Sequence, residues 1–414
     1  MTGKLTELLK EELVIAMGCT EPLALAYAGS LARHHLKEKP KRVILECSTN
    51  IFKNVRCVSL PLKSDLKGVK ASCLLGVFGG NHEKGFACVD HVDKKYDDEI
   101  KQFIEAGLIE VNYIQSPEKL YINLTLIAKD TVSVEIQKRH LNVTKITKNE
   151  KIIYQNNTEK EEKRDLSEIL KFKNIYEFAK NVDLSQLEAI IKMQYDYNYA
   201  ISKKGLTDAK GVEIGKIILA NDSTVWGKVK AYTASGCEAR MCGSLLPVVI
   251  NSGSGNQGLS SSVPIIVYGK EKQLPKTKIY RALIFSNLLT IKQKVGIGSL
   301  SAYCGIVASS GSAGAALTYL SGGTYQQIVM SMKNYLANVP GIICDGAKAS
   351  CAAKLATSLD GAILGHLLAM NNKQYQDDSG IIKQDIDETI DIVIEIANLG
   401  MKKTDETIIK NIIK

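Results

Sequence analysis

The amino-acid sequence predicts an α+β fold: a mostly helical domain, formed by an N-terminal helical hairpin and the C-terminal half, with an inserted α+β sheet domain. Three observations predict it. Apolar residues recur at helical spacing in residues 4–36, alternate with polar residues in short runs between 42 and 147, and return to helical spacing from residue 174. We therefore expect domains at 1–37, 38–160 and 161–414, with the first and last segments packed together.

The N-terminal segment is predicted to form two helices, at residues 4–17 and 22–36. Gly18 breaks the first helix, and Pro22 suits the first turn of the second, with Thr20 or Glu21 as its cap. This arrangement places Cys19 beside the exposed N–H groups of the second helix.

The central segment has the alternating pattern of strands, with helical patterns near 66–78 and 97–106 between some of them. The expected strands are 42–48, 109–115, 121–128, 132–138 and 142–147. A polar, charge-rich run at 154–165 is typical of an exposed linker.

The remaining chain is predicted to be helical, with no strands. The expected helices are 174–180, 184–203, 211–220, 224–240, 276–294, 303–320, 325–336, 347–370 and 385–397.

Composition argues against several classes of function. The net charge of +9 comes from scattered lysines without a basic stripe among aromatic residues, so we expect no nucleic-acid partner. Residues 1–10 lack an export signal, which predicts a cytoplasmic protein. Glycine, serine and asparagine interrupt the uncharged runs 241–269 and 295–332, so we expect buried interior and no membrane contact.

Three cysteines stand out by their surroundings. Cys19, Cys304 and Cys344 are each expected where a turn leads into a helix, and Lys333 is the only charged residue from 295 to 344 in a chain that is 23% charged. A dry pocket lined by thiolates at helix N-termini suits a metal cluster, because helix dipoles and metals both favour ionised sulphur. The alternative is that these are helix boundaries with cysteines that only pack.

The number and spacing of the cysteines favour a cluster with an open iron. The chain has no C-x2-C or zinc-finger pattern, and four thiolates would close such a site. Three ligands far apart in sequence leave one iron available as a Lewis acid. Cys351, two helical turns after Cys344, is the alternative fourth ligand and otherwise a core thiol.

Two polar segments are candidates for binding an anion. The glycine-rich segment NSGSGNQG lacks the lysine of a P-loop, so a carboxylate fits it better than a nucleotide, and its candidate residues are Ser252, Ser254, Asn256 and Gln257. A polar turn after a strand adds Asn50, Lys53 and Asn54. Both segments are also compatible with ordinary turns.

The combined motifs resemble the L-cysteine desulfidase family, which is related to the iron–sulphur L-serine dehydratases through its C-terminal half. The resemblance spans nearly the whole chain and rests on GCTEP (18–22), STNIFKN (48–54), RHLNV (139–143), NSGSGNQG (251–258), AYCG (302–305) and CDGAKASCAAK (344–354). The dehydratase relatives carry a CDPV-type segment, and CDGAK replaces it here. This departure favours a desulfidase but leaves the choice between cysteine and serine open.

The resemblance implies a 4Fe-4S cluster held by Cys19, Cys304 and Cys344. It also implies conversion of L-cysteine to hydrogen sulphide, ammonia and pyruvate without pyridoxal phosphate. For the base that removes the Cα proton, Lys348, Glu21 and His140 remain alternatives, and His140 can equally be a strand-end residue without a role. A homodimer is compatible with the sequence.

Competing functions remain open at this point. They are an iron–sulphur serine or threonine dehydratase, a pyridoxal-phosphate lyase that uses the glycine-rich loop as a phosphate cradle, and a non-catalytic cluster carrier or cysteine-binding protein.

Overall fold

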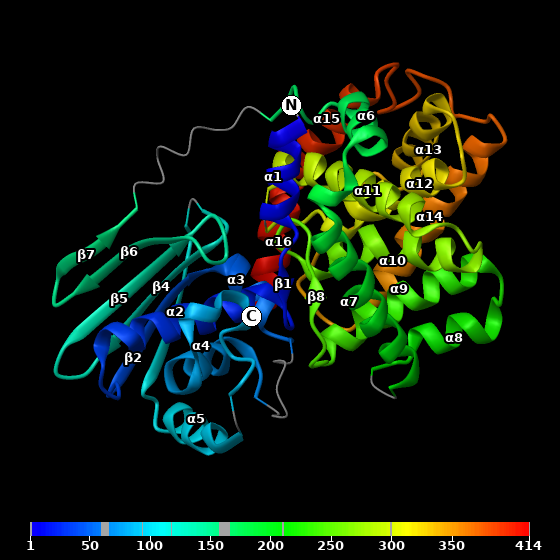
Figure 1. The fold of residues 1–414 in the computed structure, drawn as a ribbon. Helices are drawn as coiled ribbons and strands as arrows, with labels where there is room; N and C mark the ends of the chain where they lie inside the picture. The colour runs from blue at the N-terminus through cyan, green and yellow to red at the C-terminus, as the bar shows by residue number, and fades with distance from the viewer. Residues whose placement is uncertain are drawn as a thin grey trace.

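The computed structural model describes residues 2–58, 66–92, 94–116, 118–156, 166–208, 211–298 and 300–413. The chain forms two parts that lie side by side (Figure 1), which we call the sheet half (residues 20–156) and the helical half (residues 172–395). The predicted α+β fold class is therefore confirmed. The linker expected at 154–165 lies mostly outside the described residues, and its first two residues belong to a strand.

The sheet half contains a six-stranded mixed sheet in the order β3-β2-β4-β5-β6-β7. Only β2 and β3 are parallel, and the remaining neighbours are antiparallel. In β4, alternate residues Ile122, Leu124 and Leu126 are buried, which is the period of a half-buried strand. The strands are β2 (Arg42–Ser48), β3 (Ile109–Ile114), β4 (Tyr121–Ile127), β5 (Thr131–Gln137), β6 (Val143–Lys148) and β7 (Lys151–Gln155).

Helix α2 (Thr20–Leu36) packs on β4 and β5 and is held by α4 (Gly68–Gly79). The two helices approach closely at glycines: a Cβ on Gly76 would overlap the backbone of Ala26. Helix α5 (Asp97–Glu105) packs on α4 in turn. The body of α2 thus belongs to the sheet half, while its first residues point toward the helical half. The proposed division at 37 and 160 remains a prediction.

The polar turn expected after β2 is instead a short helix, α3 (Thr49–Val55). The Ser48 side chain accepts a hydrogen bond from the Ile51 N–H, which is a normal helix start. Helix α3 buries Asn50, Lys53 and Asn54, so these residues are not part of a solvated loop.

The helical half surrounds two buried helices, α10 and α12, in which most serine hydroxyl groups bond to the helix's own backbone and Ser310 is an exception. Ser262 donates to the Gly258 carbonyl and Ser312 to the Ala308 carbonyl, so these polar residues are satisfied without water. The helices are α6 (Phe172–Asn181), α7 (Glu188–Thr207), α8 (Ile214–Asn221), α9 (Val225–Met241), α10 (Gly255–Glu271), α11 (Lys276–Ile297), α12 (Gly305–Leu320), α13 (Tyr325–Asn338), α14 (Cys351–Met370) and α15 (Ile386–Glu395). Within the described ranges, no helix combines the length and apolarity needed to cross a bilayer.

The terminal segments connect the two halves (Figure 1). Helix α1 (Thr2–Glu12) leads into β1 (Ile15–Ala16), which pairs with β8 (Val248–Val249) of the helical half. The prediction of no strands after residue 160 was therefore wrong, because a two-residue pairing leaves no periodic pattern in sequence. At the other end, α16 (Lys402–Ile413), which the sequence did not predict, packs on α3.

Candidate functional site

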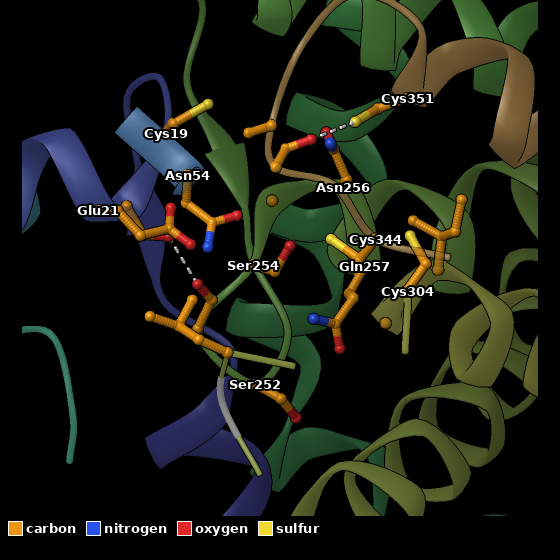
Figure 2. A pocket seen from close by; sticks show the side chains of 18 of the residues that line it. Cys19, Glu21, Asn54, Ser252, Ser254, Asn256, Gln257, Cys304, Cys344 and Cys351 are labelled. Atoms are coloured by element: carbon orange, nitrogen blue, oxygen red, sulfur yellow. Dashed lines mark hydrogen bonds between the residues drawn. The ribbon is translucent and has the colours of Figure 1, made fainter. Parts of the chain in front are cut away.

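A pocket of about 110 Å³ lies where the two halves meet and is partly open to solvent. The sheet half contributes the first residues of α2, together with Asn54 and His140. The helical half contributes the start of α10, the start of α12 and the loop before α14, as Figure 2 shows. Residues from at least six distant parts of the sequence therefore line one pocket.

Three helices of the pocket wall begin there without a side-chain cap. The residues at their N-caps are Cys19 for α2, Ser254 for α10 and Cys304 for α12, and none of these side chains caps its helix. The first N–H groups of a helix have no partner within that helix and carry partial positive charge. These N–H groups therefore favour anions in the pocket, including thiolates and carboxylates.

Cys304 and Cys344 lie side by side in this wall (Figure 2). The segments that carry them pair at Tyr303 and Ile343: the Cys304 N–H donates to the Ile342 carbonyl at 2.9 Å, and the Cys344 N–H donates to the Ala302 carbonyl at 2.6 Å. The hydrogen bond between the two thiols lowers the pKa of Cys344 to about 6 and, together with burial, raises the pKa of Cys304. The pair therefore favours a thiolate on Cys344.

Cys344 does not stand at a helix start, contrary to expectation. Helix α14 begins seven residues later, at Cys351, because the intervening loop turns at Gly346 with φ of 101°. Gly346 also has no room for a Cβ, which would meet the Lys53 carbonyl. Cys351 lines the same pocket and donates its S–H to the Gly346 carbonyl at 3.7 Å.

Arg240 contacts Cys19 from α9 of the helical half. Its Nη2 donates to the Gly18 carbonyl at 2.5 Å and lies 3.9 Å from Cys19 Sγ. Burial raises the pKa of Cys19 to about 12, and the charge of Arg240 opposes this shift.

Arg240 and Lys294 are pocket residues that the sequence reasoning missed. Lys294 is 8% exposed and donates to the Gly298 carbonyl at 2.6 Å. Its burial lowers the pKa to about 8, against the opposite influence of Cys344 and Cys304. A signal was present in the sequence: each residue directly precedes one of the uncharged runs, 241–269 and 295–332.

Several buried polar atoms of the wall have no hydrogen-bond partner among the described residues. They are His140 Nε2, Arg240 Nε, Gln257 Oε1 and Tyr303 OH. Buried polar groups are almost always paired, so these four atoms mark positions where a ligand or an ordered water would bond.

The pocket brings together most of the predicted site residues. Those that line it are Cys19, Glu21, Asn54, His140, Ser252, Ser254, Asn256, Gln257, Cys304 and Cys344. The predicted loop 251–258 is a turn at 251–254 followed by the first residues of α10.

Three predicted residues do not line the pocket: Asn50, Lys53 and Lys348. Asn50 and Lys53 bond to Asp405 of α16. Lys348 Nζ forms an ion pair with Asp345.

Sequence comparisons decide the family. The profile of the serine dehydratase alpha chain matches residues 92–410. The chain belongs to the serine dehydratase alpha chain family. Its similar relatives include UPF0597 proteins of Lachnoclostridium phytofermentans (41% identity, covering 99% of each chain), Treponema denticola (39%, covering 99% of this chain and 98% of the relative) and Finegoldia magna (39%, covering 99% of each).

Membership of the serine dehydratase family indicates a dehydratase-like enzyme of the lyase class. Within the described residues of this dehydratase-family chain, no three His, Cys, Asp or Glu side chains converge closely enough to hold one metal ion. Thiols spaced around a pocket suit a multinuclear cluster instead, in which each cysteine binds a different iron.

Proposed function

We propose that this chain is a 4Fe-4S-dependent lyase that converts L-cysteine to hydrogen sulphide, ammonia and pyruvate. One observation carries the proposal. Cys19, Cys304 and Cys344, which are more than 300 positions apart at the extremes, line the same largely buried pocket as the glycine-rich start of α10.

The donor set supports a cluster. The pocket has three thiols, uncapped helix N-termini and two buried cationic side chains, Arg240 and Lys294. All of these favour a cluster that carries negative charge together with its thiolate ligands. When bound, a cluster with three protein sulphurs supplies one iron as a Lewis acid toward the leaving group. Sulphur is a soft ligand, which favours a thiol substrate over a hydroxyl one.

The start of α10 is placed to hold the substrate carboxylate. The N–H groups of Gly255, Asn256 and Gln257 precede the first intrahelical bond, from Gly258 N to Ser254 O at 3.0 Å. The unpaired Gln257 Oε1 is an acceptor for the substrate ammonium group. Ser252 and Ser254 add hydroxyl groups at the same wall.

Asn54 completes this wall from the sheet half. Its amide donates to the backbone carbonyl of Asn50 at 2.9 Å, within the same helix α3. Lys53, held by Asp405, fixes the same helix. Lys53 also reaches the pocket wall directly: its Nζ donates to the Ser301 carbonyl at 3.4 Å, and its charge helps to lower the pKa of Cys344.

His140 is the base that the geometry favours. Its Nε2 is buried without a partner, and burial lowers the pKa of the imidazole, so the ring is neutral and able to accept the Cα proton. Gly253 packs on this ring, and a Cβ there would lie 3.1 Å from it. Glu21 lies in the same wall and stabilises the protonated ring. The released aminoacrylate hydrolyses in water to pyruvate and ammonia.

The test is one anaerobic preparation, reconstituted with iron and sulphide. We expect bound iron and sulphide together with release of hydrogen sulphide from L-cysteine, and loss of both in Cys304→Ala. A protein that binds the cluster but turns over neither cysteine nor serine would contradict the enzymatic proposal and favour a cluster carrier. Turnover in cluster-free protein that depends on pyridoxal phosphate would contradict the iron–sulphur mechanism.

L-Serine is the second candidate substrate, and the family match favours it. The same preparation, supplied with L-serine, would then form pyruvate more efficiently than it forms sulphide from L-cysteine. The ratio of the two kcat/KM values decides between the substrates.

A further inference from the structure

We propose that Arg240 is a positioning residue that holds Cys19 at the pocket and directs its free Nε–H to the sulphur of the bound cluster. The inference rests on the proposed function, because it assigns a role toward the same cluster. It concerns Cys19, the one predicted ligand that lies outside the helical half, at the N-cap of α2.

Cys19 must be held across the boundary between the two halves. It stands at the start of α2, whose body packs on β4, β5 and α4, whereas Cys304 and Cys344 belong to the helical half. Thr20 makes one contact across the boundary, from Oγ1 to the Gly253 carbonyl at 2.7 Å. Arg240 makes the contact that reaches the sulphur itself.

The shape of the guanidinium group suits this task. Nη2 bonds to the Gly18 carbonyl and faces Cys19 Sγ, while Nη1 bonds to Asn256 Oδ1 at the start of α10. The group lies so close to Gly255 that a Cβ there would overlap it. A rigid planar fork joins these segments at once, whereas a lysine ammonium group offers a single point of attachment.

The Nε–H of Arg240 has no partner among the residues that the structure describes. The residue is 3% exposed, its bonds go to a carbonyl, an amide and a thiol, and Nε is buried and unpaired within the described chain. A buried cation without a carboxylate is costly unless an anion accompanies it. A cluster with thiolate ligands supplies that charge, and hydrogen bonds to cluster sulphur raise its reduction potential.

The first test uses apo protein and measures the alkylation of individual cysteines by iodoacetamide, resolved by peptide mass spectrometry. In Arg240→Lys the positive charge remains, but the planar fork that joins Gly18, Cys19 and Asn256 is lost, so alkylation of Cys19 should become about tenfold faster. Exposed Cys57 reports reagent activity, and Cys73, buried in the sheet half, reports global unfolding. Arg281→Lys is the matched control, because Arg281 bonds the Ala179 and Val182 carbonyls away from the pocket.

An unchanged rate of Cys19 alkylation in Arg240→Lys, with Cys73 still protected, would overturn the proposal that Arg240 holds Cys19, which we call the Arg240 clamp. If Cys73 also becomes reactive, the variant has unfolded, and the milder Asn256→Ala then carries the test because it frees only Nη1. Faster alkylation of Cys19 than in the wild type supports the clamp there, and an unchanged rate overturns it.

The second test uses reconstituted protein. We expect Arg240→Gln to have a lower cluster reduction potential than the wild type, a change that a purely structural role would not produce. An unchanged potential in a variant with full iron content would overturn the contact to the cluster. If the wild type binds no iron, the proposed function fails, but alkylation of the apo protein still tests the clamp.

Discussion

Lys53 and Asp405 form a buried ion pair, with Nζ 2.6 Å from Oδ1, although they lie 352 positions apart in the chain. The Lys53 side chain is 1% exposed, and Asn50 donates to the other oxygen of Asp405 at 2.8 Å. This pair holds the C-terminal helix α16 on α3 (Figure 1), the helix that brings Asn54 to the pocket. The end of the chain therefore supports the site from outside it.

Breaking this pair should destabilise the protein. Asp405→Ala leaves a buried ammonium group without its partner, which typically costs about 3 to 5 kcal/mol, and thermal unfolding should report the loss. The double variant Lys53→Met with Asp405→Leu should recover part of it, because no charge remains buried. Lys403→Ala, which removes an exposed ion pair with Glu406, should change stability by less than about 0.5 kcal/mol.

Iron content should separate ligands from neighbouring thiols. Anaerobically reconstituted Cys19→Ala, Cys304→Ala and Cys344→Ala should each lose bound iron and acid-labile sulphide, because each removes one of three protein sulphurs. Cys351→Ala should keep most of both, as should the control Cys47→Ala in β2. The assignment would be wrong if Cys351→Ala were the variant without iron and Cys19→Ala retained it.

His140→Gln should lower kcat by about 10²- to 10⁴-fold, because the side chain can no longer accept the Cα proton. Loss of that proton, followed by NMR in deuterated water, measures the step directly. The control His91→Gln changes an exposed histidine that contacts Asp90. Lys348→Ala tests the lysine alternative, and a block of proton loss in that variant with normal loss in His140→Gln would reverse the assignment.

Stability should fall at acidic pH partly through His366, which lies far from the pocket. Burial lowers the pKa of this imidazole to about 4, and its Nδ1 lies 2.9 Å from Thr318 Oγ1. As the pH falls, the unfolded chain binds the proton first, at a pKa near 6.5. The effect of His366 on the free energy of unfolding is therefore absent above that pH, and stability declines as the pH falls toward 4.

At pH 4 the protonation of His366 should have lowered the free energy of unfolding by about 3 kcal/mol relative to pH 7, from a shift of roughly 2.5 pKa units. In denaturant titrations between pH 7 and 4, His366→Gln should therefore lose less stability than the wild type. The prediction would be contradicted if the free energy of unfolding fell equally between pH 7 and 4 in the wild type, in His366→Gln and in the exposed-site control His91→Gln.

Local sequence determined most of the secondary structure. Alternating apolar residues located β2 to β6, and Gly18 with Pro22 located the start of α2, because these signals depend on neighbours within one turn or strand. The same reasoning failed at α3, whose polar residues are buried by α16 from the far end of the chain. Burial of that kind has no local pattern.

The sequence by itself also determined which residues are unusual: cysteines beside expected helix starts, a glycine-rich segment and long runs without charge. Only the tertiary structure decided that Cys19, Cys304 and Cys344 share a pocket, that Cys344 lies in a loop, and that Arg240 and Lys294 complete the wall. Residue type and short-range period fix helices and strands, whereas a site between two halves depends on packing between segments that are hundreds of residues apart.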